Sequence, residues 1–110
     1  MTVPNADRAI IAPKKIAAYL LNLSHKRGGP KARLLLSLGY RPDDPQRLES
    51  DLRTQHLALD VTRGSENPYG FVYEIEGPIS TPNGRIVRFC SVWQVDTGTD
   101  VPRFITMYPR

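Results

Sequence analysis

The spacing of apolar residues along the chain is helical in the first half and strand-like from residue 69 onward. Apolar side chains recur at intervals of three and four residues over 16–23, which places them on one face of a helix. Over 71–76 they alternate with other side chains, as on a strand with one buried face. Helices followed by strands predict an α+β fold, with N-terminal helices packed on one face of a three- to four-stranded antiparallel sheet.

Proline residues mark where the predicted helices begin. Pro13, Pro30 and Pro45 each fit the first turn of a helix, and Asp43-Asp44 fits the cap of the third. Gly39 fits the position that ends the second helix. The sequence therefore predicts three helices, at about 14–23, 30–38 and 45–57.

Three strands are predicted after these helices, at about 71–76, 85–95 and 103–108. Pro82-Asn83-Gly84 is a hairpin signal between the first two, and a second turn is predicted at 97–99. Simple alternation places Phe104 on the same face of the last strand as Thr106 and Tyr108. A short strand at 60–62 would be the fourth, and 9–12 fits either an edge strand or the lead into the first helix.

The length of 110 residues predicts a single domain, 1–110, and the single cysteine, Cys90, excludes an intramolecular disulfide. The chain has no apolar run of the roughly 18 residues that a membrane span needs, and its first residues lack the order of a signal peptide. We therefore expect a cytoplasmic protein that does not associate with a membrane. The two histidines are not clustered with cysteines or acids, so neither a metal site nor a cofactor is expected.

Positive charge is concentrated in the first part of the chain. Residues 1–42 contain eight Lys and Arg but only one acid, Asp7, whereas 43–110 carry a net charge of −3. A local positive field of this kind attracts RNA, DNA or another phosphate ligand. The same residues would also fit a solvated basic face that only aids solubility.

The segment 24–33 combines four basic side chains with His25, Gly28 and Gly29 just before a predicted helix. Backbone N–H groups at the start of a helix favour an anion, and glycines let a ligand approach the backbone closely. Lysine and arginine pair with phosphate, while histidine exchanges protons near neutral pH. The segment is therefore a candidate phosphate-binding loop, and an exposed loop without a ligand is the alternative.

Thr106 and Tyr108 lie two residues apart on the last predicted strand, so their hydroxyls share a face. Both could hydrogen-bond a phosphate, and Tyr108 could also stack on a base or relay a proton. His56 is expected at a partly buried or surface position late in the third helix. Cys90 and Trp93 are expected in the core, with the thiol inert.

Four motifs give the chain a family resemblance. They are YLLN…HxxGxxKAR…LGY over 19–40, PYG…YxIxG over 68–77, PNGR…VW over 82–93 and VPRFITMYP over 101–109. From Pro4 to Pro109 the chain resembles a family of small, uncharacterised bacterial proteins, and related modules look like the C-terminal toxin domains of bacterial polymorphic toxins. That family is in turn similar in element order to the barnase/EndoU/colicin/RelE superfamily of metal-independent ribonucleases.

The resemblance implies a toxin endoribonuclease that cleaves RNA, such as tRNA or mRNA, through attack by the RNA's own 2′-hydroxyl. It also implies a cognate antitoxin or immunity protein. The matching catalytic positions are His25, Lys31, Thr106 and Tyr108. His25 would be the general acid or base, Lys31 the phosphate-stabilising cation, and the two hydroxyls would position the phosphate. The side chains expected to bind RNA are Lys26, Arg27, Arg33 and Arg103.

A non-catalytic binding module is the alternative from a different functional class. It would be an immunity- or antitoxin-like partner, or an adaptor for nucleic acid or protein. Glu74 and Glu76, on one predicted strand face, would then meet a basic partner. Convergence of the four candidate catalytic residues on one concave surface would favour the ribonuclease.

Overall fold

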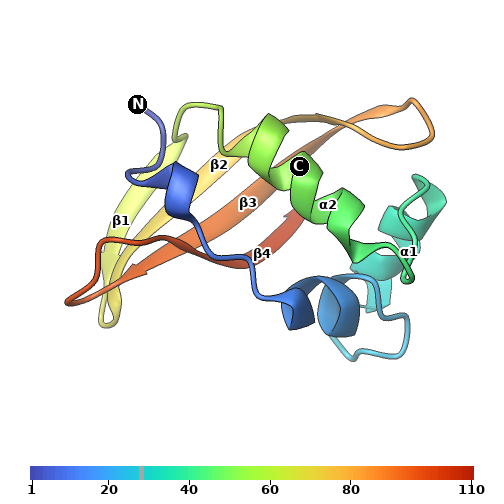
Figure 1. Ribbon diagram of the computed structural model, residues 1–110, viewed down its shortest axis with the longest axis horizontal. Coiled ribbons are helices and arrows are strands. Elements are labelled where there is room, and N and C mark those ends of the chain that lie inside the picture. The colour runs from blue at the N-terminus through green and yellow to red at the C-terminus, as the bar shows by residue number, and fades with distance from the viewer. Residues whose placement is uncertain (28) are drawn as a thin grey trace.

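The computed structural model describes residues 1–27 and 29–110 as helices packed against a four-stranded antiparallel sheet (Figure 1). Each strand pairs with the next along the chain, in the order β1-β2-β3-β4. The strands are β1 (Arg63–Asn67), β2 (Gly70–Ser80), β3 (Ile86–Asp96) and β4 (Arg103–Pro109). This arrangement confirms the predicted α+β class. The fourth strand lies at 63–67, just after the segment 60–62 that the sequence suggested.

The helices are shorter than predicted, and two of them are π-helices. The helical elements are η1 (Ala6–Arg8), η2 (Lys15–Leu20), α1 (Gly29–Ser37), α2 (Pro45–Asp51) and η3 (Leu52–His56). The first predicted helix ends before Leu23, whose side chain is exposed, and the third is divided between α2 and η3. Among the described residues, no helix has the length and apolar character needed to cross a bilayer.

The helices occupy two places relative to the sheet (Figure 1). α2, drawn in green, crosses the sheet, and η3 continues from it in contact with β2. η2 and α1, drawn in blue and cyan, lie together near one end of the molecule, where η2 also contacts β4. η2 is therefore held against β4, the last strand.

The core lies between the helices and one face of the sheet. Its sheet side consists of apolar residues on alternate positions of β2 and β3, where Ile75 and Trp93 are fully buried. Leu48 and Leu52 on α2 and η3 belong to the same cluster. Burial of each such side chain stabilises the fold by about 1.5–3 kcal/mol. Cys90 is buried as predicted, and its burial raises the pKa of the thiol.

A β-bulge in β4 changes the predicted face of one aromatic residue. The register shifts between Val92 and Trp93, so that Thr106 pairs with Val92 and Phe104 pairs with Trp93. Phe104 is thereby buried in the core against Trp93, with ring centroids 5.2 Å apart, and does not share the face of Thr106. The prediction that Phe104 and Thr106 share a face was wrong, because it assumed uninterrupted alternation.

The segment before the first helix behaves as an edge strand over one residue. Ile10 forms an isolated parallel bridge with Arg103 of β4. Its N–H donates to the carbonyl of Pro102 at 2.9 Å, and its carbonyl accepts from the N–H of Phe104 at 2.8 Å. This bridge attaches the segment that precedes η2 to β4.

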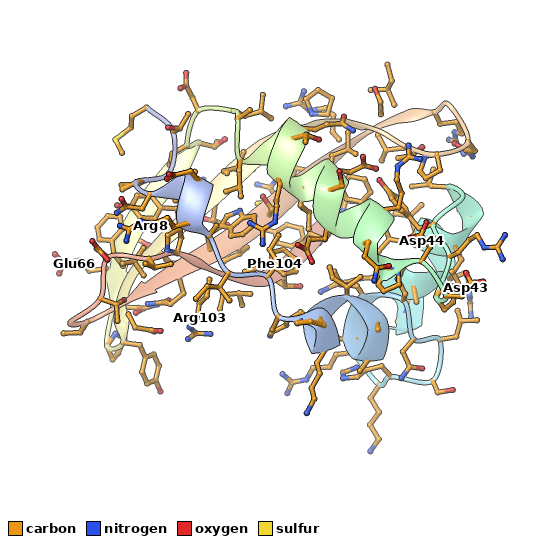
Figure 2. All side chains as sticks on the ribbon, viewed as in Figure 1. Arg8, Asp43, Asp44, Glu66, Arg103 and Phe104 are labelled. Atoms are coloured by element: carbon orange, nitrogen blue, oxygen red, sulfur yellow. The ribbon has the colours of Figure 1, made fainter. Side chains whose placement is uncertain are left out.

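The acidic pair before α2 does not cap the helix through its side chains. Asp44 occupies the N-cap position but makes no side-chain cap hydrogen bond, and Asp43 instead forms a bidentate ion pair with Arg41 at 2.9 Å. Figure 2 shows both aspartates in the loop between α1 and α2. The sequence therefore predicted the N-cap position correctly, but the expected side-chain hydrogen bond to the start of the helix is not formed.

Gly39 ends α1 in the backbone conformation that the sequence predicts. The N–H of Gly39 donates to Leu36 at 3.1 Å and the N–H of Tyr40 donates to Leu35 at 3.2 Å, the two hydrogen bonds of a Schellman motif. Gly39 has a φ of 101°, which residues with a Cβ rarely adopt. An added Cβ would also lie 3.0 Å from Cβ of Pro82 and 3.1 Å from the backbone nitrogen of Asn83.

We expect Gly39→Ala to lower the free energy of unfolding by about 2 kcal/mol, through backbone strain and this contact together. Gly84→Ala is the matched control, because Gly84 has a φ of 91° but nothing within 4 Å of an added Cβ. That variant should cost only the backbone term, about 1 kcal/mol. Urea unfolding of the two variants measures the difference. Equal losses would show that the contact with the β2–β3 turn contributes nothing.

Candidate active site

Three polar side chains from three different elements meet beside β4. Lys31 in the first turn of α1 donates from Nζ to the hydroxyl of Tyr19 on η2 at 2.6 Å. The same ammonium donates to Oγ1 of Thr106 on β4 at 2.9 Å. The two hydroxyl oxygens lie 3.1 Å apart, within hydrogen-bonding distance of each other. We call Lys31, Tyr19 and Thr106 the Lys–Tyr–Thr cluster.

The local fold accounts for how this cluster forms. The bulge in β4 keeps Thr106 off the core face while Met107 points into the core. The apolar stripe of η2 buries Ile16 and Leu20 and leaves Tyr19 half-buried at its border. Lys31 is half-buried as well, so its ammonium is partly removed from solvent and donates hydrogen bonds to two hydroxyl oxygens. The two predicted catalytic residues Lys31 and Thr106 are thus in direct contact.

His25 lies next to the cluster in the loop between η2 and α1. Its ring packs edge-on against Tyr19, with centroids 4.8 Å apart and an interplanar angle of 69°. The backbone N–H of Arg27 donates to Nδ1 of His25 at 3.1 Å, which requires Nδ1 to be unprotonated and so places the proton of the neutral ring on Nε2. The structure therefore brings His25 into contact with the cluster through Tyr19.

Tyr19 has an altered acidity as a result of its neighbours. Burial raises the pKa of Tyr19, but hydrogen bonds with Lys31 and Thr106 lower it. The positive charges of Lys31 and Lys15 lower it further, with their ammonium nitrogens 5.1 and 5.7 Å from the ring centroid, and the net effect is a lowered pKa. The hydroxyl of Tyr19 thus gives up its proton more readily than an ordinary tyrosine does.

An open groove of about 620 Å³ lies over Tyr19 and Thr106. It is bordered by three basic side chains and by His25, and none of its described lining residues is acidic. The lining residues are Ala12, Lys14, Lys15, Ala18, Tyr19, His25, Arg27, Ile105 and Thr106. With Lys31 contacting two of them, the groove is electropositive and suited to an anion such as a phosphodiester.

The predicted RNA-binding residues differ in their relation to this groove. Arg27 lines it, whereas Lys26 and Arg33 are exposed outside its lining. Arg103 forms a bidentate ion pair with Asp96, at 2.7 and 3.2 Å, which lowers the pKa of that carboxyl. Figure 2 shows Arg103 directed away from the core, opposite to Phe104.

Tyr108 lies on the face of β4 that also carries Thr106, but its hydrogen bond goes elsewhere. Its hydroxyl donates to Oε1 of Glu74 on β2 at 3.2 Å. Contact with Cys90, burial and the charge of Glu74 raise the pKa of Tyr108 to about 12. The structure thus joins three of the four predicted catalytic residues around Tyr19 and places Tyr108 in a neighbouring network.

The acidic residues of that network are paired within the chain. Arg63 donates to Glu74 at 2.8 Å and lies 3.6 Å from Glu76, and Arg110 donates to Glu76 at 2.7 Å. The hydrogen bond from Arg63 is the main reason that the pKa of Glu74 is lowered. The carboxylates that the binding-module alternative assigned to a basic partner are therefore already neutralised.

Gly29 of the predicted phosphate loop has a structural use. The backbone carbonyl of Leu23 would lie 2.9 Å from a Cβ added to Gly29, so this glycine allows the loop to pack against the start of α1. Gly28 lies outside the described residues. Over residues 1–27 and 29–110, no group of three or more His, Cys, Asp and Glu side chains is placed to hold a metal ion.

Tyr19 is a candidate functional residue that the sequence did not identify as one. Its place in the apolar stripe at 16–23 identified it as a core residue. The available signal was the hydroxyl itself, because a tyrosine at the border of a core needs a polar partner for its oxygen. Lys31, twelve residues away, supplies that partner.

Comparison with known proteins identifies a similar fold and the family to which the chain belongs. No curated protein matches the sequence. One chain of a solved contact-dependent growth inhibition toxin–immunity protein complex from Klebsiella pneumoniae 342 is similar in fold, with a TM-score of 0.71 and 20% sequence identity. The similarity covers 92% of this chain and 99% of that one. A family model described as domain of unknown function DUF6883 matches residues 2–110, and the chain therefore belongs to that family.

Proposed function

We propose that this protein is a metal-independent endoribonuclease of a bacterial toxin system. The observation that carries the proposal is Lys31, whose ammonium is held by the hydroxyls of two residues that line an electropositive groove. A fixed cation of this kind stabilises the charge that develops on a phosphate during transesterification. His25 borders the same groove and supplies an imidazole that can act as a general base.

The reaction assigns a role to each group of the site. The 2′-hydroxyl of RNA attacks the adjacent phosphorus after His25 takes its proton on Nδ1, where the proton replaces the hydrogen bond from the backbone N–H of Arg27. The bond to the 5′-oxygen then breaks. Lys31 neutralises the phosphoryl oxygens, and Thr106 helps to hold the ammonium in place. Arg27, at the groove, binds the RNA backbone, with Lys26 and Arg33 on the adjacent surface. We assign no chemical step to Tyr108 and Arg103, because each is engaged by an acid and neither is among the described residues that line the groove.

The likeness in fold to a chain of a toxin–immunity protein complex supports placement in a toxin system. A nuclease that harms its own producer requires a neutralising partner, and the groove is its natural target. The immunity-like alternative has less support from the charges, because Glu74 and Glu76 are paired with the chain's own arginines.

The direct test is incubation of the purified full chain with total RNA and with tRNA in the presence of EDTA. We expect discrete cleavage products on a denaturing gel, with 2′,3′-cyclic phosphate and 5′-hydroxyl ends. Removal of divalent metal should not change the rate. If no RNA is cut even at high protein concentration, the proposal is wrong and the binding module becomes the better hypothesis.

A further inference from the structure

In the proposed reaction, the proton that the leaving 5′-oxygen takes up has not yet been assigned a donor. When the bond to the 5′-oxygen breaks, the leaving alkoxide has to take up a proton, and His25 has only accepted one from the 2′-hydroxyl. A general acid is therefore required at the same groove. The group must be protonated near neutral pH, and its conjugate base must be stabilised.

Tyr19 meets these requirements by its position. Tyr19 lines the groove, and its hydroxyl lies 2.6 Å from the ammonium of Lys31 and 3.1 Å from Oγ1 of Thr106. Both of these neighbours can donate to a phenolate oxygen, so the negative charge left after proton transfer would be held by a cation and a hydroxyl. The ring of His25 lies 4.8 Å from the ring of Tyr19, so a bound phosphodiester can reach both groups.

We propose that Tyr19 is the general acid of the reaction, donating its hydroxyl proton to the 5′-oxygen as the phosphorus–oxygen bond breaks. This inference rests on the proposed ribonuclease function. The 2′-hydroxyl loses its proton to His25 and forms the new bond to phosphorus. The 5′-oxygen leaves with the proton of Tyr19, whose phenolate is held by Lys31. Solvent then removes the proton from His25 and returns one to Tyr19.

Tyr108 is less suited to this role. Its hydroxyl donates to Glu74, and its pKa is raised to about 12 by Cys90, burial and that carboxylate. A phenolate formed there would face a negative charge, whereas a phenolate at Tyr19 faces a positive one. The pKa values of the two tyrosines thus shift in opposite directions: Cys90, burial and Glu74 raise that of Tyr108, whereas Lys31 and Thr106 lower that of Tyr19 against the effect of burial.

The test uses Tyr19→Phe and two versions of one RNA oligonucleotide. The oligonucleotide contains a cleavage site mapped with the wild-type protein, with either the natural 5′-oxygen or a 5′-sulfur at the scissile bond. A thiolate leaves without protonation, so loss of the general acid should affect only the oxygen substrate. We expect Tyr19→Phe to lower the rate on oxygen by about 10²–10⁴-fold and on sulfur by less than about tenfold. His25→Ala should be impaired on both substrates, because the 2′-hydroxyl still needs its base.

The pH profile and a control variant complete the design. Tyr19→Phe should lose the alkaline limb of the profile and keep the acidic one, which a purely structural defect would not produce. Tyr69→Phe, at a side chain that is 73% exposed in the β1–β2 turn, should behave as the wild type. Thermal melting confirms that Tyr19→Phe is folded.

The outcomes separate this inference from the function on which it rests. Wild-type rates for Tyr19→Phe on oxygen would overturn the inference alone. Equal losses on oxygen and sulfur in a folded Tyr19→Phe variant would also overturn it, because they exclude a role at the leaving group. Failure of the wild type to cut either substrate would overturn the ribonuclease function itself.

Discussion

Lys31→Met should reduce the rate of RNA cleavage by about 10²–10³-fold at saturating RNA. Methionine keeps most of the aliphatic stem and so removes little packing, but it removes the cation that touches both Tyr19 and Thr106. The phosphoryl oxygens would then develop their charge without a fixed positive partner. Because the effect belongs to the transition state, kcat should fall much more than KM rises.

Arg85→Met is the matched control for this prediction. It also removes one positive charge, from an exposed residue in the turn between β2 and β3. Any general loss of attraction for RNA should appear equally in both variants, whereas the loss of kcat should appear only at Lys31. Steady-state kinetics on a single tRNA substrate measures both. A Lys31→Met protein with the kcat of the wild type would show that the ammonium has no role in the chemical step.

The charge pattern of the sequence predicts where the candidate site lies. The excess of basic residues in 1–42 and the spacing of the loop 24–33 pointed to His25 and Lys31 as parts of one surface. Both are near the groove because the connection between η2 and α1 is short and the two helices contact each other. The spacing of residues within this one segment was therefore enough to predict that His25 and Lys31 lie on one surface.

The contact between that loop and β4 could not be predicted from residue spacing alone. Thr106 is 75 residues from Lys31. The resemblance to ribonucleases named both as catalytic positions but left open whether they meet, and in the structure they are in contact. The bulge that separates Phe104 from Thr106 depends on the register with β3, which is a tertiary property. Tyr19 was not identified for a related reason. Helical spacing shows which residues share a face, but it does not show which of them lies at the edge of the buried area.

His56 is a further residue that sequence reasoning placed too near the surface. It is fully buried, and each of its ring nitrogens has a partner. The carbonyl of Gly77 can only accept, so Nε2 donates to it at 3.0 Å and Nδ1 accepts from the hydroxyl of Ser91 at 2.6 Å. The indole N–H of Trp93 in turn donates to Oγ of Ser91 at 2.9 Å. These groups form a continuous hydrogen-bond chain through the core.

We therefore expect His56→Ala to lower the free energy of unfolding by about 3–5 kcal/mol. The substitution leaves a cavity and removes the partners of the Gly77 carbonyl and the Ser91 hydroxyl, each in a place that water does not readily reach. His25→Ala, the matched change at the other histidine, should cost less than about 1 kcal/mol. Urea unfolding at pH 7.5 measures both, and similar losses for the two variants would contradict the structural role of His56.

The same chain of hydrogen bonds predicts how stability depends on pH. Burial lowers the pKa of His56 in the folded protein, the charge of Arg88 adds to this, and the Gly77 carbonyl only partly offsets it. The unfolded chain takes up a proton near pH 6.5, which the folded protein resists. The contribution is therefore complete above about pH 6.5 and is lost as the pH falls below that value, by up to about 1.4 kcal/mol per pH unit.

His56→Ala removes this source of pH dependence, so its unfolding free energy should fall less steeply than that of the wild type between pH 7 and pH 5. That interval lies mostly above the titration of the carboxylates, which keeps their contribution small. Equal slopes in the two proteins would falsify the assignment of a neutral, buried His56. A steeper wild-type slope would show that one proton, kept off His56 mainly by burial of its ring, contributes measurably to the stability of the fold.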